Sequence, residues 1–262
     1  MTKFDEATQA IKIDDQTYDV CLDPGYSIGG PLNGGYLVAV LLRAAVDAAP
    51  FAHPVSTSAQ FLKTPVPGPA RVRVEPLKAG RTAAFSRATL VQDGAAVIEA
   101  LVTTATLAEA EPDYSDKAPE LPPIEQCAKL PDPKPESNMT LNAQMDLRFD
   151  PPTIGWLKGR PTGRPESRAY FRMSEEQDPD AYVLALAVDA LPPVVFSAGR
   201  RGWAPTVDLT WHLRALPAPG WLTLAGSGRL ISGGWFDEEV EVWDSAGRLV
   251  AQSRQLARVG RG

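Results

Sequence analysis

The sequence predicts an α+β fold in which one module, a long central helix wrapped by an antiparallel sheet, occurs twice. Two stretches, from Tyr36 to Ala49 and from Ala181 to Ala190, are almost entirely apolar, as is typical of buried helices. Each is followed by segments with the alternating pattern of strands, separated by turn signals such as Asp93-Gly94. Because the same order of elements returns about 150 residues later, we expect a fused pair of similar modules.

The first module is predicted to occupy residues 1–108. Residues 10–21 alternate well enough for a strand, a turn and a second strand, and a glycine-rich loop then leads to the helix. Asn33 is the expected N-cap of that helix, and Gly34 and Gly35 would let a ligand approach its first backbone amides. The strands that follow are expected at 55–62, 70–79, 82–92 and 95–107.

A stretch rich in proline and charged residues separates the two modules. Residues 109–138 show no apolar periodicity and are predicted to be a linker. The second module is predicted at 139–262, with Asp178 or Asp180 as the N-cap of its helix. Its strands are expected at 145–149, 167–172, 205–213, 221–230, 235–243 and 248–259.

The composition excludes several classes of function. A net charge of −6 argues against nucleic acid or an anionic membrane surface as a partner. There is no apolar leader and no run near the roughly eighteen apolar residues of a spanning helix, so the cytoplasm is the expected location. Cys21 and Cys127 lie far apart, which fits a reducing compartment. The two histidines, His53 and His212, and the lack of a Cys-x-x-Cys pair argue against a metal site, and no cofactor is expected.

One residue of the second apolar stretch does not fit a buried helix. Asp189 follows the apolar run from Tyr182 to Val188 and precedes the stop at Leu191-Pro192-Pro193. An ionised carboxylate buried there costs several kcal/mol unless partners receive it. Asp189 is therefore the first candidate for a functional residue.

The two copies can be aligned, so that each serves as a control for the other. A carboxylate, a hydroxyl and an amide occur together only in the second copy. Taken singly, the hydroxyl and the amide are explained as ordinary polar positions, but the combination favours a site. The aligned pairs are Arg43 with Asp189, Pro54 with Thr206, and Val102 or Thr103 with Gln255.

From about Pro31 to Val259 the sequence resembles the double hotdog acyl-CoA thioesterases of the type II family. The resemblance implies two hotdog modules in one chain, acyl-CoA as the substrate, and hydrolysis with Asp189, Thr206 and Gln255 as the catalytic residues. The stretch between Asp189 and Thr206 is shorter than in that family, so the wall of the pocket is expected to differ. The matching pieces are Leu32 to Tyr36, Gly80 to Ala88, Val188 to Ala190, Pro205 to His212 and Ala251 to Gln255.

Thioester hydrolysis needs a placed water, an acceptor for its proton, and donors for the developing oxyanion. Asp189 is expected to accept the proton, while Thr206 and Gln255 orient the water. The amides of Gly34 and Gly35 are expected to polarise the thioester carbonyl, which makes them the predicted substrate-binding residues. The acyl chain is expected in the apolar seam between the modules.

Alternatives remain open at this stage. Asp208, close to Thr206 on the same strand, would be the site carboxylate if the strand register differed from the one assumed. A hotdog hydratase would need an Asp/His pair, and neither His53 nor His212 lies in a matching motif. A protein that binds acyl-CoA or another lipid-like ligand without turnover fits the same fold. Two such chains could also pair as a homodimer.

Overall fold

The computed structural model describes residues 1–108, 110–131, 133–175 and 177–259. The first half of the chain forms a helix backed by strands, as the alternation of apolar residues predicts. Its elements are α1 (Lys3–Ala7), β1 (Ala10–Lys12), β2 (Thr17–Leu22), α2 (Gly34–Asp47), β3 (His53–Phe61), β4 (Gly68–Ala79), β5 (Ala83–Gln92) and β6 (Ala95–Ala105).

The second half repeats this order with a shorter helix. Between the halves, the described residues contain only short 3₁₀ turns, η2 (Ile124–Gln126), η3 (Pro135–Ser137) and η4 (Thr140–Ala143). The elements that follow are β7 (Met145–Phe149), η5 (Pro151–Lys158), β8 (Glu166–Met173), α3 (Ala181–Ala187), η6 (Val194–Phe196), β9 (Thr206–Leu213), β10 (Leu222–Ser227), β11 (Ile231–Ser232), β12 (Trp235–Trp243) and β13 (Leu249–Arg258).

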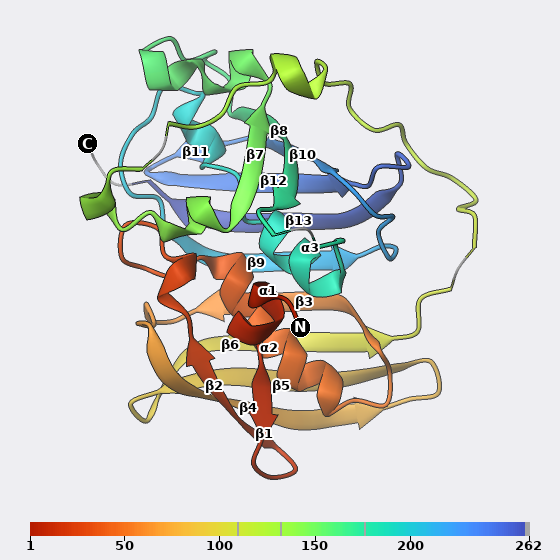
Figure 1. The fold of residues 1–262 in the computed structure, drawn as a ribbon. Helices are drawn as coiled ribbons and strands as arrows, with labels where there is room; N and C mark the ends of the chain where they lie inside the picture. Colours follow the sequence, from red (N-terminus) through yellow and green to blue (C-terminus); the bar gives the residue numbers. More distant parts are fainter. Residues whose placement is uncertain (109, 132, 176, 260–262) are drawn as a thin grey trace.

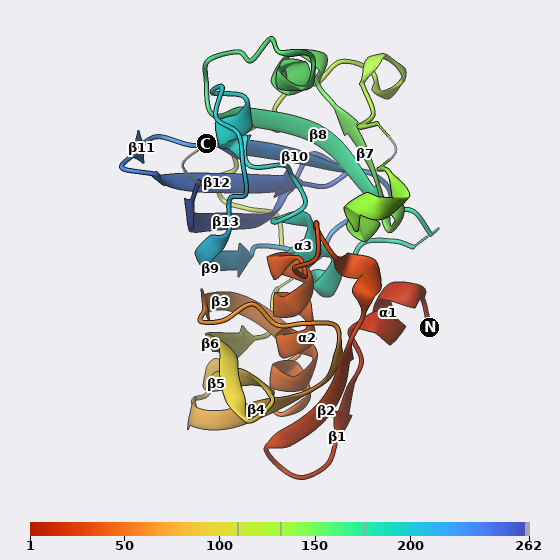
Figure 2. The ribbon, with the colours of Figure 1, turned by 90° about the vertical axis from the view of Figure 1, so that its left-hand side faces the viewer.

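The strands of both halves join into one curved antiparallel sheet (Figure 1). Their order across the sheet is β1-β2-β4-β5-β6-β3-β9-β13-β12-β10-β8-β7, with β11 paired to β12. The two halves therefore meet where β3 pairs with β9. Turned by a quarter, the molecule shows α2 and α3 on the same side of this sheet, one above the other (Figure 2).

The helices are buried because almost every side chain on them is apolar. In α2, ten of the eleven residues from Gly35 to Ala45 are buried, the exception being Arg43, and in α3 only Tyr182 keeps part of its surface. This apolar packing holds both helices against the inner face of the sheet and against each other. Within the described ranges, no helix is both long and apolar enough to cross a membrane.

Two β-bulges occupy corresponding places in the two halves. In the pairing of β3 with β6, Val55 has no partner, so Pro54 faces Thr104 out of step with the rest of the ladder. In the pairing of β9 with β13, Val207 has no partner in the same way. A bulge inserts one residue, so the side chains beyond it change face.

The structure corrects the sequence prediction at several points. The helix expected over 181–190 ends at Ala187, because the prolines at 192 and 193 and a turn at Val188 stop it early. The strand expected over 221–230 ends at Ser227, where the chain turns to hydrogen-bond the carboxylate of Asp237. The short helices α1 and η5 were not predicted. The other expected helix and strands are present, with ends shifted by at most two residues.

Candidate active site

Asp189 lies in the turn after α3, where it faces the start of α2 from the other half of the chain. Its carboxyl oxygen Oδ2 accepts hydrogen bonds from the backbone N–H of Gly35 at 2.9 Å and from Nδ2 of Asn33 at 2.9 Å. The side chain keeps part of its surface accessible. The partners that a buried carboxylate needs are therefore supplied by the N-terminus of α2, where the helix dipole is positive.

Asn33 connects the two halves through a single amide group. It is 2 % exposed and caps α2, since its Oδ1 accepts from the N–H of Tyr36 at 2.9 Å. Its Nδ2 then donates to both the backbone oxygen, at 2.8 Å, and the carboxylate of Asp189. The sequence predicted the cap correctly but not the second role, because the partner lies 156 residues away.

The two glycines after Asn33 permit a close approach between the helices. A Cβ at Gly35 would overlap the backbone oxygen of Ala185, and one at Gly34 would come within 3.0 Å of Oδ2 of Asp189 and of the Phe61 ring. The sequence predicted that the amides of both glycines point at a substrate. In the structure the N–H of Gly35 donates to the Asp189 carboxylate, and hydrogen bonding from both glycines lowers the pKa of Asp189; the contact with substrate stays a prediction.

Thr206 and Gln255 are hydrogen-bonded neighbours on adjacent strands, with Thr206 Oγ1 donating to Gln255 Oε1 at 2.6 Å. Gln255 is 6 % exposed and lies on the inner face of β13. Strict alternation from Leu209 and Trp211, which face inward, would leave Thr206 on the outer face. The bulge at Val207 turns Thr206 inward to meet the amide.

The pKa of Asp189 depends on its burial and on the groups around it, Gln255 among them. Desolvation raises the pKa of Asp189 to about 6, although hydrogen bonds from Gly35, Gln255, Gly34 and Asn33 act in the opposite direction. Gln255, which is hydrogen-bonded to Thr206, thus also acts on the ionisation of Asp189, so the three residues predicted from the sequence lie near one another. Their catalytic roles remain a prediction.

A fourth polar residue of the site, Glu238, was missed by the sequence analysis. It is 3 % exposed on β12, directly opposite Gln255 in the strand register. Desolvation is the main cause that raises its pKa to about 8, and the charge of Asp189 adds to the rise. A signal was present in the sequence, because Glu238 falls between Phe236 and Val240 on the apolar face of an alternating strand.

The corresponding positions of the first half carry no such group. Strand register places Val102 at the position of Gln255 and Ser86 at that of Glu238, and Pro54 takes the place of Thr206. Arg43, inside α2, occupies the position that aligns with Asp189. It is bound by α1 through an ion pair with Asp5 and a hydrogen bond to Thr8, and it lies 3.7 Å above the ring of Tyr182.

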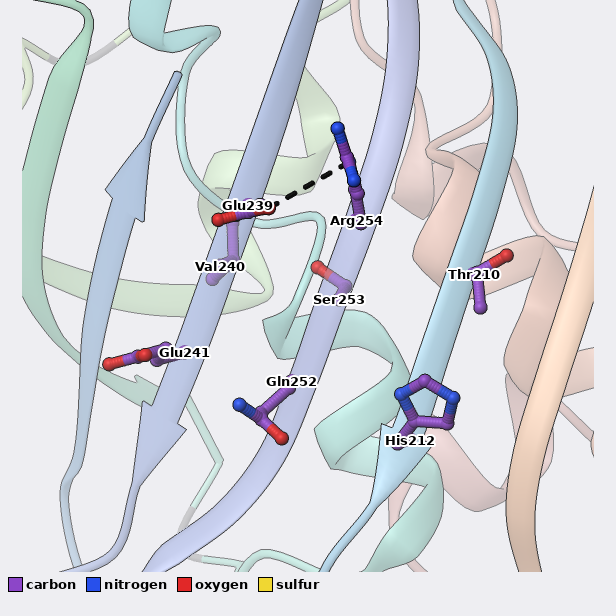
Figure 3. Close-up of a pocket in the computed structure, with 8 residues that line it drawn as sticks. All are labelled: Thr210, His212, Glu239, Val240, Glu241, Gln252, Ser253 and Arg254. Atoms are coloured by element: carbon purple, nitrogen blue, oxygen red, sulfur yellow. Dashed lines mark ion pairs between the residues drawn. The ribbon is translucent and has the colours of Figure 1, made fainter. Parts of the chain in front are cut away.

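Other polar residues lie away from this group. A shallow depression is formed on the outer face of β9, β12 and β13, with the Glu239–Arg254 ion pair at its edge and His212 beside it (Figure 3). Alternation puts Asp208 on this outer face too, away from Gln255. His53 accepts a hydrogen bond from the N–H of Leu107, and His212 is exposed on the outer face of β9. Among the described residues, no cluster of His, Cys, Asp or Glu is suited to a metal ion.

Comparison with known proteins assigns the chain to a family. Residues 22–108 match the model of an acyl-CoA thioesterase N-terminal domain, and residues 124–259 match that of an acyl-CoA thioesterase C-terminal domain. A Mycobacterium tuberculosis protein described as uncharacterised is 35% identical over 270 residues, which span 91% of this chain and 89% of the relative.

Solved structures agree with this assignment. A Thermobifida fusca protein assigned as a thioesterase II is 44% identical, with a TM-score of 0.92 and coverage of 100% of this chain and 98% of the other. An Alicyclobacillus acidocaldarius protein described as having a hot dog fold is 21% identical, with a TM-score of 0.86 and coverage of 100% and 99%. The chain therefore has the hot dog fold and belongs to the acyl-CoA thioesterase family.

Proposed function

We propose that the protein hydrolyses acyl-CoA thioesters, with Asp189 as the general base and Thr206 and Gln255 as the residues that hold the attacking water. The observation that carries this proposal is a desolvated carboxylate with a pKa near 6, on a residue that keeps part of its surface accessible, whose ionisation is favoured by the hydrogen-bonded Thr–Gln pair. A base of this pKa is ionised at neutral pH and still strong enough to take a proton from water. Family membership supports the same reaction.

In the proposed reaction, water adds to the thioester carbonyl carbon while Asp189 takes one of its protons. The tetrahedral intermediate then breaks its C–S bond, which gives the free acid and the CoA thiol after the proton is returned. A carbonyl placed beside Asp189 would meet the positive end of α2 at Gly34 and Gly35, which supports substrate binding there. The ring of Phe61, close to Gly34, supplies an apolar wall next to this position.

We also infer that the chain consists of two hotdog modules, residues 1–108 and 139–262, joined by the segment 109–138. The equivalent bulges at Val55 and Val207 support this division. So does the junction of the sheet, where Ser58 pairs with Thr210 and their hydroxyl groups form a hydrogen bond of 2.5 Å. The sequence alignment of the two copies makes these two residues equivalent, so the pair marks a local two-fold relation between the modules.

The test is CoA release from a panel of acyl-CoA thioesters of different chain length, measured for wild type, Asp189→Asn and Gln255→Ala. Each substitution is expected to raise the barrier by about 2–4 kcal/mol, the usual cost of removing one essential polar group. Asp208→Asn is the matched control, since it neutralises a nearby carboxylate on the outer face and should leave turnover unchanged. Full turnover in Asp189→Asn and Gln255→Ala would refute the assignment. Binding of acyl-CoA by wild type without CoA release would indicate the non-catalytic alternative.

A further inference from the structure

Glu238 is tied to two parts of the site at once. Its Oε2 accepts the backbone N–H of Val194 at 3.0 Å, so the glutamate holds the start of η6 in the segment that joins Asp189 to Thr206. On β12 it lies directly opposite Gln255 in the register with β13. Among the described residues, neither Glu238 nor Asp189 forms an ion pair with a lysine or arginine. The charge near Gln255 is therefore set by these two carboxyl groups.

The hydrogen bond from Thr206 fixes which end of the Gln255 amide is the acceptor. Its oxygen accepts from Thr206, so its NH₂ group is left to donate, and hydrogen bonding from Gln255 lowers the pKa of both Asp189 and Glu238. In a neutral carboxyl group the carbonyl oxygen accepts from Val194 and the hydroxyl oxygen keeps a lone pair that can accept from Gln255, whereas the NH₂ group of an amide is a donor only. In the first half, the pair Glu238 and Gln255 is replaced by Ser86 and Val102. The buried glutamate thus occurs only where there is an amide to orient.

We propose that Glu238 is a positioning residue of the reaction, which fixes the orientation of the Gln255 amide and fastens the segment around Val194 to the site. This inference rests on the proposed function, because it concerns how the water held by Gln255 is aimed. A misplaced water lowers the rate of attack without weakening the binding of substrate. Loss of Glu238 is therefore expected to lower kcat and to leave KM nearly unchanged.

The ionisation of Glu238 gives the proposal a second signature. The groups that face this carboxyl are the Asp189 carboxylate, the Gln255 amide and the N–H of Val194. With its pKa raised to about 8, Glu238 is mostly neutral at pH 7, so Asp189 carries the charge of the pair. Above pH 8, a second negative charge beside the developing oxyanion opposes its formation. Wild-type kcat should fall there.

The first experiment compares the pH dependence of kcat in wild type, Glu238→Gln and Glu239→Gln. Glu238→Gln should lower kcat at pH 7 by about tenfold, because the NH₂ group of the new amide would face the NH₂ group of Gln255, and two donors cannot hydrogen-bond to each other. It should also remove the alkaline decline, because an amide does not titrate. Glu239→Gln makes the same substitution on the outer face of the same strand and should behave as wild type. A Glu238→Gln protein with wild-type kcat and an unchanged alkaline decline would overturn the proposal.

Val194→Pro provides a second test if Glu238→Gln does not fold. It removes the N–H that lowers the pKa of Glu238, so the alkaline decline should move to higher pH. Proline suits this place, the first residue of a 3₁₀ turn, and Pro193 before it already has φ −48° and ψ 126°. Val194→Ala is the control, since it shortens the side chain and keeps the N–H. The same alkaline limit in both variants would overturn the proposal.

A measurement without substrate separates this inference from the proposed function. Absence of CoA release from every thioester in wild type would refute the thioesterase proposal alone. Carboxyl-carbon NMR of glutamate-labelled protein then decides the placement of Glu238. Asp189→Asn should lower the pKa of Glu238, because the charge of Asp189 contributes to its rise. An unchanged pKa of Glu238 in that variant would refute its coupling to the site.

Discussion

Replacing Asn33 with alanine should affect both folding and the acid limit of catalysis. The change removes the N-cap of α2 together with the two hydrogen bonds that Nδ2 donates to Asp189. Loss of an N-cap costs about 1 kcal/mol. Loss of a hydrogen bond to a charged group costs about 1.5–3 kcal/mol. Asn33→Ala is therefore expected to lower the free energy of unfolding by about 2–4 kcal/mol.

This cost should depend on pH. The pKa of Asp189 is about 6 in the folded chain against an ordinary value of 3.8, so ionisation of Asp189 reduces stability as pH rises between these values. Asn33 favours the ionised form. Its loss should therefore raise the pKa of Asp189, and the destabilisation should be larger at pH 8 than at pH 5. Urea unfolding at the two pH values and the acid limb of kcat/KM measure the two effects.

Asp180→Ala is the matched control for Asn33→Ala. Asp180 caps α3 by accepting from the N–H groups of Tyr182 and Val183, and no hydrogen bond joins it to Asp189. It should lower stability by about 1 kcal/mol and leave the acid limb of kcat/KM in place. An acid limb that stays at the wild-type pH in Asn33→Ala, or moves equally in Asp180→Ala, would refute the coupling of the cap to the base.

Three further outcomes are expected. In wild type, kcat/KM at pH 5 should be about a tenth of its plateau, because a base of pKa near 6 is then mostly protonated; a flat profile would exclude Asp189 as the base. Gly35→Ala should cost about 1–3 kcal/mol in urea unfolding, since the new methyl group meets the oxygen of Ala185, and wild-type stability would contradict this packing. Arg43→Met should lower Tm by releasing Asp5 while the acid limb stays in place, and a shifted limb would count against the separation of the two positions.

Most of the fold could be predicted because its determinants are local. The alternation of apolar residues marks the strands, and Asn33 and Asp180 mark the helix starts, since a cap acts within three residues of itself. The end of α3 could not be predicted from composition, because the apolar run continues to Val188. The turn at Val188 that helps to end the helix early carries Asp189 to Asn33 and Gly35, which lie 156 and 154 residues away in the sequence.

The site was partly predictable for a different reason. Duplication exposed Asp189, Thr206 and Gln255 as polar residues with unlike counterparts, and this comparison needs no structure. It missed Glu238, because a glutamate in an alternating strand that also carries Glu239 and Glu241 resembles a solvated one. It also gave no sign that the amide of Gly35 donates to Asp189. Whether an amide at a helix start is free depends on what the fold brings to it, here the carboxylate of Asp189.

The bulge at Val207 bears on how one chain can contain one half with the candidate site residues and one half without them. On a regular strand, the parity of a position decides which face its side chain takes. The bulge turns Thr206 to the other face of the strand. The first half has the same bulge at Val55, but the residue at the corresponding position is Pro54, which has no hydroxyl group. The backbone frame is thus common to both halves. Whether a half contains a base, a hydroxyl and an amide is decided by substitutions on that frame, with no rearrangement of the main chain.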